Sequence, residues 1–335
     1  MAEAGPNADR LVTVFGGSGF VGRSIVRALA RRGWRVRVAV RRPDLANFLQ
    51  PLGGVGQILA VQANLRYPAS IEAALAGADA VINAAGIQRQ SGRQNFEAVH
   101  VFGPREIARA ASRGDIRTLV HVSGIGADAQ SANPYIASKG RGEAAMREAF
   151  PAAIILRPSV VFGPEDDFFN RFAALARLLP ALPLFGGGAA KMQPVFAGDV
   201  AKAAAAALAG EARPGATYEL GGPEAMTLRQ VVEFVLRTVE RRRALIPLPF
   251  GVSRILAHGT EIASALTLGL FPQALTTTRD QIELLRDDNL VSPAALAEGR
   301  TLQGLGIAAQ RVEAIAPSYL YRFRKTGQFA SSRPA

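Results

Sequence analysis

Three glycines with regular spacing follow the first apolar run of the chain. Residues 11–15 read LVTVF, and Gly16, Gly19 and Gly22 come next, where the helical pattern SIVRALARRG begins. Gly16 allows a tight turn, Gly19 lets the backbone approach a pyrophosphate, and Gly22 lets the helix pack on the strand. Free N–H groups and the positive dipole end of the helix favour phosphate. The pattern predicts a dinucleotide-binding turn, with a ligand-free tight turn as the alternative.

Two arginines stand where the second strand of such a unit ends. An acidic residue there would bind the ribose 2′-hydroxyl of NAD, but this chain reads AVRRPD. The guanidinium groups of Arg41 and Arg42 suit a 2′-phosphate through paired, charge-assisted hydrogen bonds. Asp44 follows Pro43, too late to reach the ribose. The pair predicts NADP(H) in preference to NAD(H); two solvated arginines in an arginine-rich chain are the alternative.

Strand-like and helical patterns alternate around this turn and continue to residue 122. Strict alternation implies right-handed βαβ units and a parallel sheet. We therefore expect an α/β fold with a Rossmann-type, doubly wound parallel sheet and a smaller, mostly helical C-terminal lobe. Residues 1–163 form the NAD(P)-binding domain, to which 194–222 return, and residues 164–193 and 223–335 form the lobe. Strands are expected at 35–40, 57–63, 80–86, 118–124 and 153–158, and helices at 70–78 and 95–113.

Composition limits the other kinds of site. The 335 residues include no cysteine, which excludes disulfides and thiolate chemistry. His100, His121 and His258 lack the spacing of metal ligands. The net charge of +12 fits either a basic face for an anionic partner or a coding bias toward arginine, and no nucleic-acid signature accompanies it. Without a leader pattern or an 18-residue apolar run, we expect a cytoplasmic protein, or one bound peripherally to the inner face of a bacterial plasma membrane.

In order along the chain, these segments resemble the extended and atypical branches of the short-chain dehydrogenase/reductase superfamily. The matching pieces are GGSGFVG (16–22), ANL (63–65), NAAG (83–86), HVSGIGA (121–127), YIASK (135–139), LRPSVVFGP (156–164) and PVFAGDVA (194–201). Asn64 departs from the family, which has an acid there. The resemblance implies a cofactor site formed by Gly16, Ser18, Gly19, Phe20, Gly22, Arg41, Arg42, Asn64, Leu65, Ala84, Ala85, Gly86, Ser123, Tyr135, Lys139 and Pro158, with Arg157 and Ser159 as further candidates.

The same resemblance assigns Tyr135 and Lys139 to the Tyr-x-x-x-Lys pair of active family members. There the tyrosine transfers the proton, while the lysine holds the nicotinamide ribose and lowers the tyrosine pKa. A second match, Tyr321 with Lys325, lies near the C-terminus, outside the family's position. Active extended members carry a further hydroxyl after the strand-ending serine, but here Gly124 follows that serine. The pair therefore indicates either cofactor holding without turnover or catalysis.

Segments of the second half resemble the family of NADPH-binding accessory subunits of respiratory complex I and their bacterial relatives. They are GPEAMTLRQVVEFV (222–235), TTTRDQIELLRDDNLV (276–291) and SYLYRFRKTGQF (318–329). The resemblance implies a non-catalytic protein that keeps NADPH as a structural ligand and docks on complex I near the quinone site and the membrane, or a ubiquinone-related factor. The apolar stretch 245–272 would face a partner or an anionic lipid surface, or form the lobe's own core.

Two other functions remain open from the sequence. One is an active NADP-dependent oxidoreductase or epimerase that acts on a sugar-nucleotide, steroid-like or quinone-related substrate through Tyr135 and Lys139. The other is a regulator whose partner senses the NADPH/NADP ratio. The enzyme predicts that Tyr135→Phe abolishes turnover while NADPH binding survives, whereas the regulator predicts a partner affinity that changes with the oxidation state of the cofactor.

Overall fold

The computed structural model describes residues 7–251, 283–325 and 327, and it divides into two compact units. The sheet unit contains residues 7–158, 197–220 and 291–309, and the second unit contains residues 159–196, 221–251, 283–290 and 310–325 with 327. Each unit is treated by itself below. Residues 291–309 lie with the sheet, whereas the sequence pattern grouped them with the C-terminal lobe.

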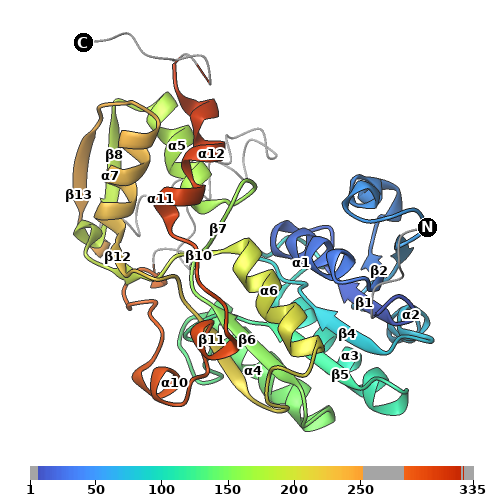
Figure 1. The fold of residues 1–335 in the computed structure, drawn as a ribbon. Coiled ribbons are helices and arrows are strands. Elements are labelled where there is room, and N and C mark those ends of the chain that lie inside the picture. Colours follow the sequence, from blue (N-terminus) through green and yellow to red (C-terminus); the bar gives the residue numbers. More distant parts are fainter. Residues whose placement is uncertain (1–6, 252–282, 326, 328–335) are drawn as a thin grey trace. The chain divides into compact units, whose positions relative to one another are not determined.

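A seven-stranded sheet forms the centre of the sheet unit, and each adjacent pair of strands is parallel (Figure 1). The predicted α/β fold with a Rossmann-type parallel sheet is confirmed. The edge strand β11 was not predicted from the sequence. In sheet order, the strands are β11 (Thr217–Leu220), β6 (Ile154–Pro158), β5 (Thr118–Val122), β4 (Ala80–Asn83), β1 (Leu11–Phe15), β2 (Arg35–Val40) and β3 (Ile58–Gln62).

Helices follow most of these strands, as expected of βαβ units. Helix α1 is amphipathic, with Ile25 and Leu29 fully buried and Arg27 and Arg31 exposed to solvent. Alanine-rich α6 packs along α1, because small side chains let two helices approach closely (Figure 1). The helices of this unit are α1 (Phe20–Arg31), η1 (Pro43–Leu52), α2 (Pro68–Leu75), η2 (Glu97–Phe102), α3 (Gly103–Arg113), α4 (Pro134–Ala149), α6 (Ala197–Leu208), α10 (Pro293–Ala297) and η5 (Gln303–Leu305).

The helix expected over residues 95–113 is present in two parts. Its first turn, η2, has π-helical hydrogen bonding, and the regular α-helix α3 begins at Gly103. A π-helical turn inside an α-helix often accompanies a functional site, because it turns one side chain away from the regular spacing. His100 lies in this turn and is buried.

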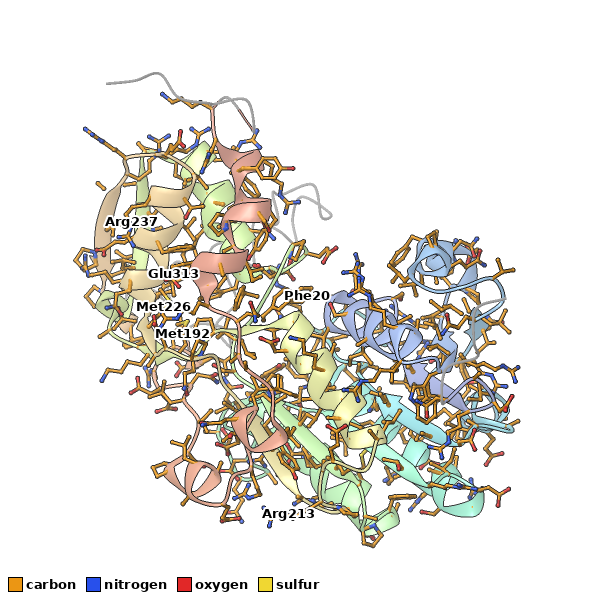
Figure 2. The ribbon with its side chains drawn as sticks, in the orientation of Figure 1. Phe20, Met192, Arg213, Met226, Arg237 and Glu313 are labelled. Atoms are coloured by element: carbon orange, nitrogen blue, oxygen red, sulfur yellow. The ribbon has the colours of Figure 1, made fainter. Side chains whose placement is uncertain are left out.

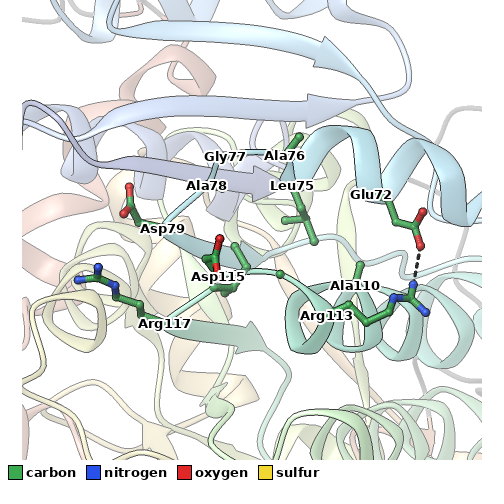
Figure 3. A pocket seen from close by; sticks show the side chains of 12 residues that line it. Glu72, Leu75, Ala76, Gly77, Ala78, Asp79, Ala110, Arg113, Asp115 and Arg117 are labelled. Carbon is green, nitrogen blue, oxygen red and sulfur yellow. Dashed lines mark hydrogen bonds and ion pairs between the residues drawn. The ribbon is translucent and has the colours of Figure 1, made fainter.

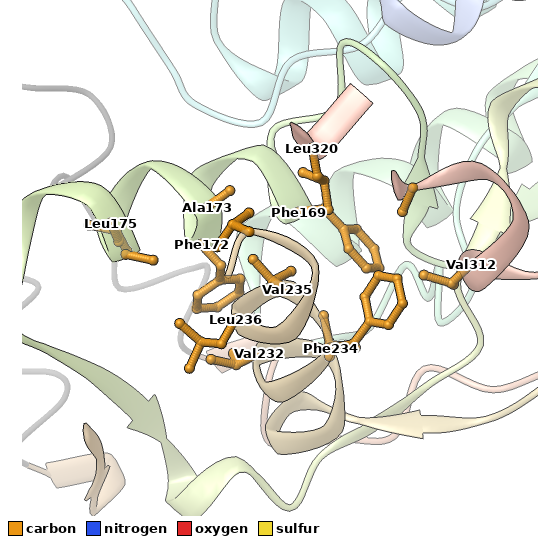
Figure 4. Close-up of a cluster of buried hydrophobic side chains, with 14 of the residues drawn as sticks. Phe169, Phe172, Ala173, Leu175, Val232, Phe234, Val235, Leu236, Val312 and Leu320 are labelled. Carbon is orange, nitrogen blue, oxygen red and sulfur yellow. The ribbon is translucent and has the colours of Figure 1, made fainter. Parts of the chain in front are cut away.

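The second unit has its own apolar core, formed by α5 (Phe168–Leu178) and α7 (Leu228–Thr238) with the short helices α11 (Val312–Ile315) and α12 (Pro317–Leu320). Phe169, Phe172 and Val235 are among its members (Figure 4). Three pairs of short strands complete the unit. They are β7 (Val161–Phe162) with β10 (Val195–Phe196), β8 (Ala181–Phe185) with β13 (Ala244–Leu248), and β9 (Lys191–Met192) with β12 (Met226–Thr227).

A buried carboxylate joins the C-terminal helices to the start of α5 in this second unit. Asp166 accepts hydrogen bonds from the Tyr319 hydroxyl at 2.7 Å and from the backbone N–H groups of Gly163 and Phe169. Met192 and Met226 lie opposite each other in the β9–β12 pair (Figure 2).

Within the described residues, no helix combines the length and apolar character that a membrane crossing requires.

Candidate functional site

The turn between β1 and α1 needs glycine because side chains there would collide with other parts of the protein. Gly16 has a φ of +73°, and a Cβ there would lie 2.7 Å from the backbone of Ala85. A Cβ on Gly22 would lie 2.1 Å from the Gly16 carbonyl oxygen. Gly17, which was not singled out from the sequence, would collide with Val38 at 2.7 Å. These contacts hold the turn against β2 and against the turn that follows β4.

Gly19 differs from its neighbours because space remains around it. It is exposed, and a Cβ on it would meet only the Gly16 carbonyl oxygen, at 3.3 Å. It precedes α1, whose first turn begins at Phe20 (Figure 2) and has neither a capping side chain nor an acidic residue. Ser18, half-buried, directs its carbonyl to the guanidinium of Arg23 at 3.1 Å. The helix start thus offers uncapped N–H groups at the carboxyl edge of the sheet, where a phosphate fits.

The two arginines after β2 have different surroundings. Arg42 forms a bidentate pair with Asp44, with Nη2–Oδ2 at 2.8 Å and Nε–Oδ1 at 3.2 Å. The Arg42 hydrogen bonds lower the pKa of Asp44 below its usual value. Arg41 is exposed and makes no ion pair with any described residue. From the sequence, Asp44 was considered only for its distance from the ribose, and the structure shows that it engages one of the two predicted phosphate ligands.

The turns after β3 and β4 are fixed by their own side chains. Asn64 is half-buried, and its Oδ1 accepts a hydrogen bond from the backbone N–H of Arg66 at 3.1 Å. Asn83 is fully buried, and its Oδ1 accepts from the backbone N–H of Ala85 at 3.1 Å. Leu65 packs on the sheet core, and Ala84 and Gly86 flank Ala85 in the second turn.

Tyr135 and Lys139 lie one turn apart at the start of α4. Asn133 caps this helix by accepting hydrogen bonds from the backbone N–H groups of Tyr135 and Ile136. Lys139 is buried, its Nζ lies 5.9 Å from the centre of the Tyr135 ring, and a Cβ on Gly86 would lie 3.4 Å from that Nζ. The structure therefore brings the predicted pair beside the turn after β4.

Burial shifts the pKa of both residues toward their neutral forms. It lowers the pKa of Lys139 to about 8, although Glu143 opposes the change. It raises the pKa of the Tyr135 hydroxyl. Burial therefore favours the protonated hydroxyl of Tyr135, the form that donates a proton or a hydrogen bond.

His100 connects the site's segments, although from the sequence it was considered only as a metal ligand. Its Nε2 accepts from the backbone N–H of Ile87 at 3.1 Å, so the neutral ring carries its proton on Nδ1, which lies 2.9 Å from the Ser138 hydroxyl. Ser138 in turn donates to the Tyr135 carbonyl at 2.7 Å. Burial, with Lys139 nearby, lowers the pKa of His100 to about 2. One uncharged imidazole thus joins the turn after β4, η2 and α4.

Two further glycines allow this arrangement. A Cβ on Gly142 would lie 1.8 Å from the His100 carbonyl oxygen, and a Cβ on Gly140 would lie 2.2 Å from the backbone nitrogen of Ala129. Helix α4 therefore lies directly against backbone on two sides. The GRG sequence after Lys139 was the available signal for this close packing.

The end of β5 holds two buried polar atoms without a partner. Ser123 Oγ makes no hydrogen bond with any described residue, and neither does Nε2 of His121, whose Nδ1 lies 3.1 Å from the Asn83 amide. Buried polar groups are nearly always satisfied, so an unpartnered hydroxyl at a strand end indicates a ligand or a water. The next residue, Gly124, has no side chain, so it cannot supply a second hydroxyl at this strand end.

The remaining predicted residues are held by protein contacts. Arg157 forms a buried bidentate ion pair with Glu143 of α4, with Nη2–Oε2 at 2.7 Å and Nε–Oε1 at 2.9 Å. The carbonyl of Pro158 accepts from the backbone N–H of Ile125 at 3.0 Å. Ser159 belongs to the second unit, where its hydroxyl donates to the Asn289 carbonyl at 3.0 Å. Both charges of the Arg157 pair are satisfied within the protein.

Some residues that the sequence suggested lie in the second unit or outside the described residues. Tyr321 and Lys325, the second Tyr-x-x-x-Lys match, lie in the second unit at η6 (Tyr321–Phe323) and just after it. His258 and residues 252–282 of the apolar and complex I-like stretches lie outside the described residues. No group of three metal-binding side chains occurs within the part of the chain that the structure describes.

A separate pocket of about 500 Å³ opens at the opposite edge of the sheet (Figure 3). Asp79 and Arg117 line it immediately before β4 and β5 begin, and Glu72 and Arg113 pair across its rim. Open α/β sheets bind their ligands at the carboxyl ends of the strands. The candidate site therefore lies at the other edge, where the glycine turn, the turn after β4 and the start of α4 converge.

One family of known proteins matches the part of the chain that holds the glycine turn, the tyrosine and the lysine. The family model described as "NAD dependent epimerase/dehydratase family" matches residues 12–221, which include the glycine turn, Ser123, Tyr135 and Lys139. The chain belongs to the NAD-dependent epimerase/dehydratase family. The resemblance to extended short-chain dehydrogenases/reductases is confirmed. Members bind a dinucleotide, and the glycine turn, the uncapped α1 and the unpartnered Ser123 hydroxyl fit one.

Relatives in the family include both respiratory subunits and an enzyme. "NADH dehydrogenase [ubiquinone] 1 alpha subcomplex subunit 9, mitochondrial" of Arabidopsis thaliana is 32% identical over 95% of this chain and 79% of its own length. "Ceramide reductase" of Caulobacter vibrioides is 36% identical over 53% of this chain and 55% of its own length. The predicted relationship to the complex I subunit family is therefore confirmed over nearly the whole chain.

Solved structures of other proteins share the fold of this chain. The UDP-glucose 4-epimerase of Thermotoga maritima superimposes with a TM-score of 0.66 at 17% identity, over 94% of this chain and 99% of that one. At this identity the match concerns the epimerase/dehydratase fold alone.

Proposed function

We propose that this protein holds NADP(H) as a structural ligand and serves as an accessory or assembly subunit of a complex I-type NADH:quinone oxidoreductase. The observation that carries the proposal is the 32% identity to the mitochondrial subunit over 95% of the chain, because it spans both units rather than the dinucleotide-binding part alone. A ligand that binds only the folded state stabilises it by mass action without any reaction.

The chemistry of the Tyr135–Lys139 pair supports retention without turnover. Burial raises the pKa of the Tyr135 hydroxyl, which disfavours the tyrosinate, and the resemblance to extended members implies that Gly124 stands where active ones carry a further hydroxyl. His100 and the Asn133 cap fix the pair in place, which suits a group that positions a ribose. Tyr135 and Lys139 are thus proposed as cofactor ligands, with Gly19, the start of α1, Asn64, Leu65, Ala84–Gly86, Ser123 and Pro158.

Preference for NADP(H) is proposed on Arg41. Its side chain is exposed and makes no ion pair with a described residue, so it is available to a 2′-phosphate. Arg42 shares its charge with Asp44, so it contributes less than Arg41 while that pair persists. NAD(H) would lack the phosphate and gain nothing from either guanidinium.

The test of this function is the migration of the protein in native membranes. Membranes from cells that make the protein are solubilised mildly, and their complexes are separated under native conditions. Co-migration with NADH-oxidising, quinone-reducing activity is expected, together with loss of assembled complex when the gene is deleted. Migration as a free species, with the complex intact in the deletion strain, contradicts the proposal.

The second candidate is an active NADP-dependent reductase, and the identity to a ceramide reductase favours it. Bound nicotinamide would supply the hydride, and Tyr135 would deliver the proton to a carbonyl oxygen while Lys139 holds the ribose. This function requires that a carbonyl substrate oxidises NADPH with the purified protein and that Tyr135→Phe abolishes the reaction while NADPH binding persists. The absence of turnover across lipid, quinone-related and sugar-nucleotide carbonyls would eliminate it.

A further inference from the structure

One arginine of α1, Arg23, lies against the glycine turn. It comes directly after Gly22 in the sequence, and its side chain is half-buried. Its Nη2 donates to the carbonyl of Ser18 at 3.1 Å. Arg27 and Arg31, further along the same helix, are exposed to solvent. Among these three arginines, Arg23 alone folds back over the turn that the structure offers to a phosphate.

An aromatic ring from η1 lies against the same guanidinium. The central guanidinium carbon of Arg23 is 4.8 Å from the centre of the Phe48 ring, and η1 packs against α1. Contact with an aromatic face favours the charged guanidinium and limits its orientations. Two independent contacts therefore fix this side chain, one to a carbonyl of the glycine turn and one to a ring of η1.

The course of η1 indicates which phosphate this guanidinium approaches. η1 begins at Pro43, immediately after Arg41 and Arg42 at the end of β2. In a Rossmann unit, the pyrophosphate lies at the start of the first helix, and the 2′ position of the adenosine ribose lies beside the end of the second strand. Arg23 starts from that helix and reaches the segment that follows that strand. Its guanidinium therefore lies on the side of the glycine turn where the 2′ position is expected.

The charge of this part of the chain favours a strongly charged anion. Residues 10–52 include nine arginines and a single acid, Asp44, which is bonded to Arg42. A phosphate monoester such as the 2′-phosphate carries nearly two negative charges and three acceptor oxygens, and guanidinium groups bind it through charge-assisted hydrogen bonds. A guanidinium has five N–H donors, so the bond from Arg23 to Ser18 and bonds to a phosphate can coexist.

We propose that Arg23, held by Ser18 and Phe48, binds the 2′-phosphate of NADP(H) together with Arg41. The inference rests on the proposed retention of NADP(H) and names a further residue that selects this nucleotide over NAD(H). Arg41 is exposed after β2, whereas Arg23 is ordered by its contacts before any ligand binds. An ordered side chain loses less conformational freedom on binding, so Arg23 contributes more to the preference than Arg41 does.

Calorimetric titration of the full chain with NADPH and with NADH tests the proposal. Arg23→Gln should raise the dissociation constant of NADPH about thirtyfold and that of NADH less than about twofold, because NADH has the pyrophosphate but no 2′-phosphate. Arg27→Gln is the matched control, since it removes the same charge from an exposed position one turn further along α1, and it should leave both constants unchanged. As a probe without nicotinamide, 2′,5′-ADP should displace NADPH from the wild-type protein far better than 5′-AMP does, and Arg23→Gln should remove most of this difference.

A second variant tests the proposal without removing the charge. Phe48→Leu deletes the ring beside Arg23 and should weaken NADPH binding about fivefold, with NADH binding unchanged. Phe48 is 47% exposed, so the variant should stay folded. Tyr67→Leu is the control, because Tyr67 is 55% exposed and its ring lies 5.8 Å from the guanidinium carbon of Arg66. It should leave the ratio of the two affinities unchanged.

The results also separate this inference from the proposed function. An equal loss of NADPH and NADH affinity in Arg23→Gln would overturn the inference, because it would assign Arg23 to the pyrophosphate or to the shape of the glycine turn. Unchanged NADPH affinity in both Arg23→Gln and Phe48→Leu would overturn it as well, and would leave retention of NADP(H) intact. A wild-type protein that binds neither nucleotide would contradict retention itself and the inference with it.

Discussion

The candidate site has two ends that are built in opposite ways. The arginine end, formed by Arg41, Arg42 and Asp44, consists of exposed charges after β2. The tyrosine end, formed by Tyr135, Lys139 and His100, is buried or half-buried and is held by neutral hydrogen bonds and backbone contacts. Exposed charges can be exchanged at little cost in stability, whereas a buried polar group depends on each of its partners. We therefore expect nucleotide selectivity to depend on the first end and folding stability on the second.

The largest expected effect is the loss of the tyrosine end by Gly142→Ala. The added methyl would enter the His100 carbonyl, so α4 must move, at a cost of more than about 3 kcal/mol in unfolding free energy. Urea unfolding of the nucleotide-free protein measures it. Gly114→Ala is the control, because a Cβ there makes ordinary contact at 3.5 Å. Equal stability of the two variants would mean that α4 does not lie against η2.

The pH dependence of stability should identify Lys139. Burial lowers its pKa to about 8, below the usual value of 10.5, so the unfolded chain binds more protons between these two values. Stability from this group therefore rises as pH increases from about 8 to 10.5, by on the order of 3 kcal/mol, and is constant below that window. Lys139→Met should remove this rise from urea unfolding profiles. A wild-type profile parallel to that of the variant would contradict the burial of a charged ammonium.

A smaller effect is expected for His100→Leu. The substitution leaves the Ile87 N–H and the Ser138 hydroxyl without their partner, which costs about 2 kcal/mol of unfolding free energy. His100→Gln should recover part of this loss, since its carbonyl can accept from Ile87. Unfolding titrations of both variants, with NADPH affinity as the second readout, test the link. No recovery by glutamine would show that volume, rather than hydrogen bonding, is what His100 contributes.

At the arginine end, Arg41→Gln should weaken NADPH binding about tenfold, because one charge-assisted contact to the 2′-phosphate is lost. NADH binding and thermal stability should stay unchanged. Calorimetric titration at low and high salt measures both, and the difference between the nucleotides should shrink as salt screens the phosphate contact. An equal loss for NADPH and NADH would assign Arg41 a structural role.

The smallest expected effect on NADPH binding concerns Asp44, the partner of Arg42. Asp44→Asn breaks the pair that holds Arg42 and should tighten NADPH binding about two- to fivefold, since the freed guanidinium can reach a phosphate. Asp9→Asn, at an exposed site near the N-terminus, is the control for the change in net charge. Weaker binding of NADPH to the Asp44 variant would mean that the pair positions Arg42 for the nucleotide rather than withholding it.

The two ends also differ in how far the sequence predicts them. Alternating patterns predicted the parallel sheet, because strands that alternate with helices form βαβ units. The segment AVRRPD located both arginines at the end of the second strand. Nothing local marked His100, whose role depends on a π-helical turn and on contacts with Ile87 and Ser138, distant in the chain. β11 was missed because its four residues, TYEL, show no long pattern. The ion pair between Arg42 and Asp44 was missed because Asp44 was considered only for its distance from the ribose.

The proposal that this family member retains NADP(H) rests on both ends of the site. The most direct measurement isolates the protein from its own cells in the native assembly, denatures it and identifies the released nucleotide by mass and amount. We expect NADP(H), close to one per chain, and its loss from the Gly142→Ala variant. Release of NAD(H), or of no nucleotide from a folded and assembled protein, would contradict retention of NADP(H).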